Sequence, residues 1–295
     1  LLMELKKQNV GVVCGCGIRG IEKTTKGFTF HTKGGDFYAT KCIMATGGKT
    51  LKKSGSDGSG FLYLESLGHH IIDLVPGLIG LKGKQSFFAD IAGIRADVKV
   101  DLYIESTHVC SERGELQLTN YGISGIPVFQ VSRYAAKLLD QKKKVLASLN
   151  FLPDLDETKV RYLLREQREV LSGETAEDFL SGIFNKKLAS VLLKAAKIQT
   201  DKKAGLLTSE ELERLGATIR EFKIPVKETN SFEQAQICTG GVDTAEIEVE
   251  TMQSKRVPGL YIVGELLDVD GICGGYNLQW AWTSGYLAGK GAANA

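Results

Sequence analysis

The spacing of apolar and polar residues divides the chain into stretches with different periodicities. Residues 10–46 carry short apolar runs separated by glycines and polar turns, a pattern typical of β-structure. The runs lie at 10–13, 28–32, 37–40 and 41–45, and the sequence KGGD at 33–36 predicts a hairpin turn between the second and the third. A serine- and glycine-rich loop at 54–60 then leads into a helix expected over 61–67, which Gly68 ends.

The middle of the chain follows two other patterns. Between about 75 and 131 the segments are short, contain many glycines and alternate between apolar and polar residues, most regularly at 97–105 and 115–119. This pattern predicts a small antiparallel sheet or barrel. Residues 155–217 are rich in leucine, lysine and glutamate and predict helices, one of them capped at Thr208–Ser209.

The last stretch returns to the style of the first. A buried strand expected over 260–263 leads into a glycine-rich loop and then into a helix of small residues from about Tyr276. Sheet and glycine loops at both ends, with a different architecture between them, predict an α/β fold, α+β overall, in which one discontinuous domain is interrupted. We place that domain at 1–72 and 236–295. The insertion is then 73–235, with its helical part at about 155–217.

The composition excludes few functions, but it narrows the expected partners and cellular location. The net charge of +2 is too small to favour nucleic acid or anionic lipid, and no apolar run approaches the roughly 18 residues of a membrane span. The six cysteines lack zinc-site spacing, and no export signal is present. We therefore expect a cytoplasmic protein with free thiols and no bound metal. Its partner would be a small-molecule substrate, with neither nucleic acid nor membrane involved.

The segment 239–289 carries the strongest indication of function. A strand, a glycine-rich turn and a helix follow one another there, as in proteins that hold a phosphate-bearing cofactor at the carboxyl end of a sheet. A carboxylate just past the strand can accept hydrogen bonds from sugar hydroxyls, and the first helix amides can donate to an electron-rich ring. A structural turn with an exposed acid is the alternative. The candidate residues are Gly264, Glu265, Gly274, Gly275, Tyr276, Asn277 and Leu278.

A second strand end strengthens this interpretation. The apolar run at 41–45 leads directly into Thr46, Gly47 and Gly48. Glycines at such a position let the backbone approach a ligand without Cβ clashes, although an ordinary strand-to-loop turn has the same sequence. Paired with the first strand end, this one favours ligand contact.

The sequence GCGIRG at 15–20 matches the dinucleotide-binding fingerprint but lacks its context. That fingerprint requires a helix directly after it, so that backbone amides and the helix dipole face a pyrophosphate. Here a hairpin follows at Phe28 and leaves no room for a helix. We interpret these glycines as part of a twisted strand.

No catalytic acid or base can be assigned from the sequence. Cys273 lies in the glycine-rich loop, but no second cysteine nearby could form a redox disulfide with it. His31 and His108 lie in expected strands without an obvious partner, and a surface or capping role is the default for His69 and His70. No serine–histidine–aspartate set can be assembled.

Taken in order, several motifs resemble those of one family. They are ATGG at 45–48, GSDGSG at 55–60, GELQLT at 114–119 with GISG at 122–125, and above all the segment 239–282. Together they resemble the BaiN/RdsA family of bacterial FAD-dependent oxidoreductases, also described as aminoacetone-oxidase-like flavoproteins. The resemblance extends over essentially the whole chain.

The resemblance implies a two-dinucleotide-binding-domain flavoprotein fold, with a Rossmann-like FAD domain interrupted by a β-barrel-like insert and a small helical part. It also implies that about a hundred residues precede Leu1 and carry the phosphate-binding unit, which agrees with an amphipathic helix already open at Leu1. Within this chain, Ile18 falls where the family's backbone touches adenine, and Thr46–Gly48 fall near the pyrophosphate and ribityl. Glu265 would hold the ribityl chain, and Gly275–Leu278 would lie against the flavin ring.

Two functions stay open at this point, and the sequence argues against a third. The first is an FAD-dependent oxidoreductase that moves a hydride or electron pair through the flavin, with NADH or NADPH as a candidate reductant and the substrate unknown. The second is a flavin-free, non-catalytic fragment that acts as a binding domain. The third, a nicotinamide-only dehydrogenase, would need a true strand–GxGxxG–helix unit, which the sequence lacks.

Overall fold

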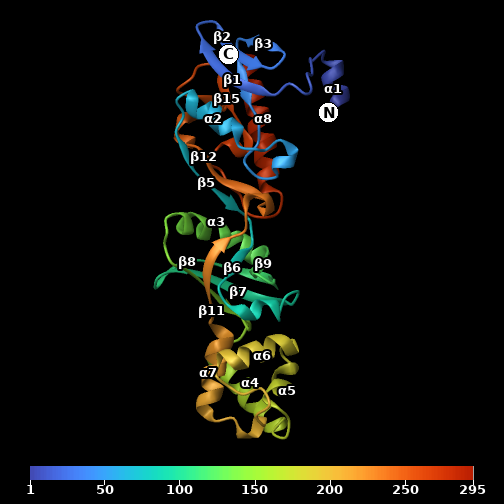
Figure 1. The fold of residues 1–295 in the computed structure, drawn as a ribbon, viewed down its shortest axis with the longest axis vertical. Coiled ribbons are helices and arrows are strands. Elements are labelled where there is room, and N and C mark those ends of the chain that lie inside the picture. The colour runs from blue at the N-terminus through green and yellow to red at the C-terminus, as the bar shows by residue number, and fades with distance from the viewer. Residues whose placement is uncertain (295) are drawn as a thin grey trace.

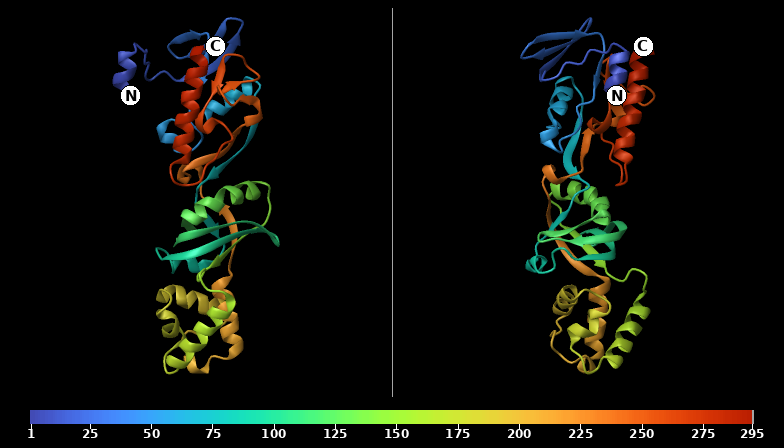
Figure 2. Two further views of the ribbon diagram at one scale, coloured as in Figure 1. Left: turned by 180° about the vertical axis from the view of Figure 1, so that it is seen from behind. Right: turned by 90° about the vertical axis from the view of Figure 1, so that its right-hand side faces the viewer.

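The computed structural model describes residues 1–294, which form an elongated molecule of three parts (Figure 1). The first residues and the last helix lie together in one end part, a closed barrel forms the middle, and helices form the other end (Figure 2). This mixed architecture confirms the predicted fold class.

The first part is built around a four-stranded sheet in the order β13–β14–β15–β4, in which β15 and β4 run parallel. These strands are β4 (Cys42–Met44), β13 (Ile247–Glu248), β14 (Gln253–Ser254) and β15 (Leu260–Ile262). Parallel pairing brings the carboxyl ends of β4 and β15 to the same edge of the sheet. The residues that follow Met44 therefore meet those that follow Ile262.

Two helices, α2 (Ser59–Ser66) and α8 (Tyr276–Asn294), share a core with this sheet. Phe61 and Leu64 come from α2, Ala288 comes from α8 and Tyr261 comes from β15. An antiparallel sheet of β1 (Ile18–Thr24), β2 (Gly27–Thr32) and β3 (Gly35–Ala39) lies at the outer end (Figure 1).

A two-stranded antiparallel ribbon connects the first part to the barrel. It consists of β5 (Ile71–Gly77) and β12 (Ile237–Val242), with Gly77 opposite Ile237. The chain leaves the first part along β5 and returns along β12, so both crossings run side by side (Figure 1).

The barrel closes in the order β10–β11–β6–β9–β8–β7, with β10 paired to β7. Its strands are β6 (Leu81–Gly83), β7 (Arg95–Ile104), β8 (Thr107–Leu118), β9 (Gly122–Gly125), β10 (Val145–Asn150) and β11 (Phe222–Thr229). Helix α3 (Ile126–Asp140) packs its buried residues Val128, Val131 and Ala135 into the barrel core.

Four helices fill the connection between β10 and β11. They are α4 (Glu157–Val170), α5 (Ala176–Ser181), α6 (Lys186–Ala195) and α7 (Ser209–Arg220). Thr208 caps α7, because its hydroxyl accepts from the amide of Glu211 while the Glu211 carboxylate accepts from the amide of Thr208. One continuous apolar core runs from the barrel through these helices.

Short 3₁₀ turns complete the structure: η1 (Lys52–Ser54), η2 (Ser86–Ala89), η3 (Ala204–Leu206), η4 (Phe232–Gln234), η5 (Thr244–Glu246) and η6 (Gly264–Leu266).

The apolar run at 10–13 does not form the expected strand. After the short helix α1 (Leu2–Lys7), the chain is irregular until β1, and Val10, Val12 and Val13 are at least half exposed. Within residues 1–294, no neighbouring strand pairs with this run, so its apolar character does not translate into sheet. Of the GCGIRG glycines, Gly20 lies in β1, and the chain continues into β2 rather than into a helix.

The domain boundaries at 72/73 and 235/236 stay a proposal. Both fall at the β5–β12 ribbon or just beside it. No helix in the described part of the chain is both long enough and apolar enough to cross a membrane.

Candidate cofactor-binding site

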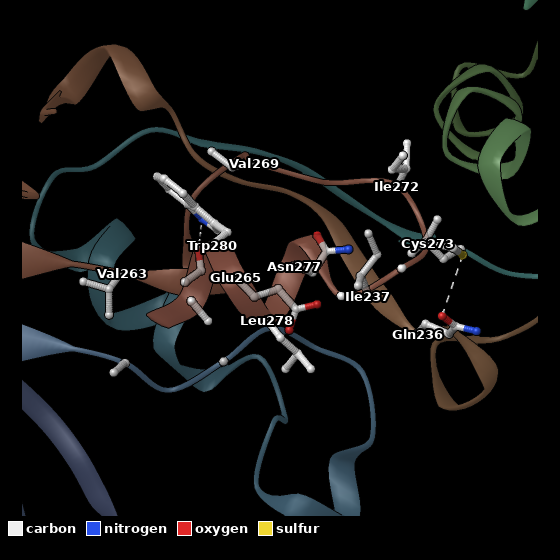
Figure 3. Close-up of a pocket in the computed structure, with 17 residues that line it drawn as sticks. Gln236, Ile237, Val263, Glu265, Val269, Ile272, Cys273, Asn277, Leu278 and Trp280 are labelled. Carbon is white, nitrogen blue, oxygen red and sulfur yellow. Dashed lines mark hydrogen bonds between the residues drawn. The ribbon is translucent and has the colours of Figure 1, made fainter. Parts of the chain in front are cut away.

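A cavity of about 420 Å³ opens where the carboxyl ends of β4 and β15 meet the start of α8. Figure 3 shows side chains from the first part and from the β5–β12 ribbon converging on it. It is lined by Ala45, Gly47, Leu78, Gln236, Ile237, Val263, Gly264, Glu265, Val269, Ile272, Cys273, Gly274, Gly275, Asn277, Leu278, Trp280 and Ala281.

Helix α8 fixes the peptide at the end of β15 from both sides. The amide of Gly264 donates to the Ser284 hydroxyl at 2.9 Å. The Gly264 carbonyl accepts from the indole of Trp280 at 3.1 Å (Figure 3). Gly264 adopts φ +64°, a left-handed conformation that favours glycine. The turn after β15 is therefore held rigidly against the helix.

The Glu265 carboxylate joins the segment after β15 to the segment after β4 and to β12 of the ribbon. One oxygen accepts from the amide of Gly48 at 2.9 Å, and the other accepts from the amide of Cys238 at 2.6 Å. Burial raises the pKa of Glu265, against the opposing effect of these two amide donors. Each carboxylate oxygen has a second lone pair, so Glu265 can accept a further hydrogen bond from a ligand in the cavity.

The glycine-rich loop (residues 267–275) forms the wall of the cavity before α8. The amide of Gly271 donates to the Asn277 side chain at 2.8 Å, and the Asn277 amide group donates back to the Gly271 carbonyl at 3.1 Å. Gly274 and Gly275 both have positive φ. The first amides of α8 lack intrahelical acceptors and carry the positive end of the helix dipole, so they offer donors to a negatively polarised group.

The structure brings most of the predicted site residues together. Seven of them line the cavity: Gly47, Gly264, Glu265, Gly274, Gly275, Asn277 and Leu278. Gly48 reaches the site through its hydrogen bond to Glu265. Thr46 lies beside them and faces α2, where a Cβ added at Gly60 would touch the Thr46 hydroxyl. Tyr276 starts α8 and is 58% exposed.

Ile18 lies elsewhere. It starts β1 and borders a separate hollow between the segment 13–19 and the β2–β3 turn. Its carbonyl accepts a hydrogen bond from the Tyr63 hydroxyl at 2.6 Å. Any contact between Ile18 and a cofactor would therefore occur away from the cavity at α8.

Several lining residues were missed by reasoning from the sequence. Ile237 begins β12, and Leu78 and Gln236 lie directly beside the β5–β12 ribbon. Only the pairing of these two strands places them at the cavity. Trp280 also lines the cavity, and its indole donates to the carbonyl of Gly264. The apolar-polar pattern around Gln236 does not indicate that this residue lines a cavity.

The residues present fit a flat, largely apolar ligand with a polar edge. Ile272 and Leu278 are 39% and 62% exposed at the cavity, an exposure of large apolar side chains that such a ligand would cover. Glycines at 47, 264, 274 and 275 allow close approach of the backbone, and the amides of α8 supply donors at one edge.

These features define a Rossmann-like protein with a candidate nucleotide-cofactor site at the carboxyl edge of its parallel strands. The chain belongs to the HI0933-like family, because the HI0933-like protein Rossmann domain matches residues 1–291. This membership confirms the resemblance inferred from the motifs.

Among the curated relatives of this chain, three carry names of two kinds. The chain is 42% identical over 293 residues to the 3-dehydro-bile acid delta(4,6)-reductase of Clostridium scindens, covering 99% of this chain and 72% of that protein. It is 29% identical over 290 residues to the ribosomal RNA dihydrouridine synthase of Escherichia coli, covering 98% and 70%. For the ribosomal RNA dihydrouridine synthase of Haemophilus influenzae, the identity is 27% over 263 residues, covering 88% and 62%.

The prediction that no nucleic acid is involved was wrong, because it cannot be drawn for a chain with these relatives. Two relatives carry names that specify ribosomal RNA. The net charge of +2 was a poor guide, because contact with RNA depends on where charges lie on the surface and not on their sum.

Proposed function

We propose that this protein is an FAD-dependent oxidoreductase that reduces a carbon–carbon double bond conjugated to a carbonyl group. The observation that carries the proposal is the cavity at the start of α8, in a chain 42% identical over nearly its whole length to a reductase. That relative supports the oxidoreductase class, and the shape and donors of the cavity support the flavin.

The substrate class comes from the chemistry that the relatives' names have in common. A delta(4,6) double-bond system in a 3-dehydro bile acid is conjugated to the 3-oxo group. Dihydrouridine is uridine whose ring double bond, conjugated to a ring carbonyl, has been reduced. Both reactions add a hydride to one carbon and a proton to its neighbour, so a single type of site serves a steroid and a nucleobase.

The residues of this chain would bind the flavin, orient the substrate and shield the reacting atoms from water. The bound flavin would supply the hydride. The amides at the start of α8 would stabilise negative charge at one edge of the ring, and Glu265 would accept from sugar-chain hydroxyls. At the end of the cavity near the ribbon, the thiol of Cys273 lies 4.0 Å from the carbonyl oxygen of the Gln236 side chain, which makes a polar end for a substrate carbonyl (Figure 3).

The test is a titration of the purified protein with FAD, followed by anaerobic reduction with NADH or NADPH and then by addition of substrate. We expect a shifted flavin spectrum on binding and reoxidation by a steroid with an enone. A saturated steroid ketone, as the matched control, should leave the reduced flavin unchanged. A short RNA with an unpaired uridine forms the third arm.

Each outcome has a definite meaning. Reoxidation by neither the enone nor the RNA, with flavin bound and reduced, would contradict the conjugated-bond substrate. An unshifted flavin spectrum would contradict the flavin site and support the alternative of a non-catalytic binding domain.

A further inference from the structure

A stripe of polar side chains on α3 contacts the back of the glycine-rich loop. Gln130, Arg133 and Lys137 share one face of the helix, opposite the residues that enter the barrel core. The Gln130 side chain accepts from the amide of Cys273 at 3.2 Å. Lys137 lies 3.8 Å from the carboxylate of Asp268.

Arg133 is the centre of this stripe. Its guanidinium donates to the carbonyl of Asp270 at 2.9 Å and lies 3.6 Å from the Asp270 carboxylate. The other carboxylate oxygen of Asp270 accepts from the hydroxyl of Thr239 at 2.8 Å, which ties the same residue to β12. Asp270 is thus held from the barrel side and from the ribbon side at once.

The placement of Arg133 has a cost. Its side chain is only 21% exposed, and its Nε is buried without a hydrogen-bond partner among the described residues. A buried donor left unpaired lowers stability. The guanidinium is otherwise fixed by the Tyr134 hydroxyl at 3.1 Å, with the Tyr134 ring 4.9 Å away. A position that costs stability yet is so firmly fixed points to a role in geometry.

The opposite face of the same loop is the cavity wall. Val269, Ile272 and Cys273 line the cavity. Val269 stands between Asp268 and Asp270, whose carboxylates lie beside Lys137 and Arg133 of α3. A shift of the loop away from α3 would therefore move the wall. Arg133 itself does not line the cavity.

We propose that Arg133 is a positioning residue: from the barrel, it holds the glycine-rich loop in the place that shapes the cofactor and substrate cavity. The barrel is then part of the site, although its helix contributes no lining side chain. The effect on turnover rests on the proposed function, whereas the effect on the loop does not.

The test compares Arg133→Met with Arg95→Met in the full chain. Arg95 lies in β7 of the same barrel and makes an exposed ion pair with Glu115, which makes it a matched control. Amide hydrogen exchange is measured over residues 267–275 without added flavin. We expect exchange at Cys273 and its neighbours to rise about tenfold in Arg133→Met, because the loop loses a charge-assisted contact, and to stay unchanged in Arg95→Met.

A second pair of variants guards against misfolding and separates positioning from charge. Asp270→Asn keeps an oxygen for Thr239 but removes the carboxylate beside Arg133, so it should reproduce the faster exchange. Arg133→Lys keeps the cation and one donor and should restore part of the protection. In the flavin-loaded enzyme, Arg133→Met should raise KM more than it lowers kcat.

Unchanged loop exchange in both Arg133→Met and Asp270→Asn would overturn the inference. Faster exchange without any flavin binding in the parent protein would sustain the inference and overturn the proposed function instead. The two ideas therefore fail by different measurements.

Discussion

Gly48 occupies one of the tightest positions beside the cavity. A Cβ added there would lie 2.6 Å from a carboxylate oxygen of Glu265 and 2.9 Å from the Cβ of Cys238. These are the same residues that the Glu265 carboxylate brings together. Space at Gly48 is thus a condition for the three segments to meet.

Gly48→Ala should lower the free energy of unfolding by about 1–3 kcal/mol, because the methyl group forces the Glu265 carboxylate off its two amide donors. Chemical denaturation measures this, and FAD titration should show weaker binding. Gly285→Ala is the control: its Cβ meets nothing within 4 Å, and alanine in a helix interior should stabilise by up to about 1 kcal/mol. Equal stability of the two variants would contradict this account of Gly48.

At this scale, the sequence predicted the parts of the site that follow a strand directly. Gly47 and Gly264 were predicted, because a buried apolar run that ends in glycine can be recognised within a few residues of the sequence. Gln236 and Leu78 were not, because they reach the cavity through pairing between strands about 160 residues apart in the chain. One of the two donors to Glu265 was missed for the same reason, because the Cys238 amide belongs to that ribbon.

At the scale of elements, a sealed polar cluster joins the end of α2 to the β13–β14 hairpin. His69 contacts the carboxylate of Glu246 at 2.6 Å through Nδ1 and the hydroxyl of Ser254 at 2.9 Å through Nε2. That order of groups resembles a hydrolase triad. Ser254 is only 4% exposed, however, and its hydroxyl accepts from the amides of Arg256 and Val257. The cluster therefore serves structure.

Ser254→Ala should destabilise the protein by about 2–4 kcal/mol, since it leaves one histidine nitrogen and two amides without their partner in a buried place. Thermal or denaturant unfolding measures the change. Ser66→Ala is the matched control on α2, where the exposed hydroxyl donates to the Tyr63 carbonyl, and its effect should be near zero. A loss of similar size in both variants would contradict the structural role of the cluster.

Elements with a regular apolar-polar period were predicted well, whereas the isolated apolar run at 10–13 was not. The alternation at 97–105 corresponds to β7, and the cap at Thr208 opens α7 as expected. The run at 10–13 has the right composition for a strand, but a strand needs a partner as well as apolar residues, and composition does not reveal the partner.

At the scale of the whole molecule, the apolar core is split in two. One core joins the barrel to the helical end, and the other belongs to the first part. The chain's two tryptophans, Trp280 and Trp282, both lie in α8 and so report on the first part alone. The two cores are expected to unfold as separate cooperative units.

Leu192→Ala tests this division. Leu192 lies fully buried in α6 within the barrel–helix core, so its truncation should cost about 2–5 kcal/mol there. Far-ultraviolet circular dichroism should show an earlier transition for the barrel and helices together. Tryptophan fluorescence should keep its midpoint; a shift of equal size in both signals would show that the molecule unfolds as one unit.

The interrupted α/β fold was predicted, because the apolar-polar pattern changes twice along the chain and then returns to that of the first stretch. The fusion of barrel and helices into one core was not. It depends on aromatic residues such as Phe151 and Phe222, which meet edge to face at the junction, and pairwise packing of this kind leaves no periodic trace in the sequence.

Because the ribbon carries both chain crossings, the barrel and the helical end can be exchanged together as one insert. Gly77 and Ile237 stand opposite each other, and opposed residues of antiparallel strands lie about 4.5–5.5 Å apart, a gap that one or two linking residues can close. An entire insert can thus be grafted in or out at a single seam without disturbing the sheet beneath. A graft would still have to rebuild the contact between Arg133 and Asp270, since the wall of the cavity depends on it. Recognition of new substrates can in this way be acquired by exchanging one insert, which also replaces Leu78 and Gln236, while the cavity residues of the first part stay in place.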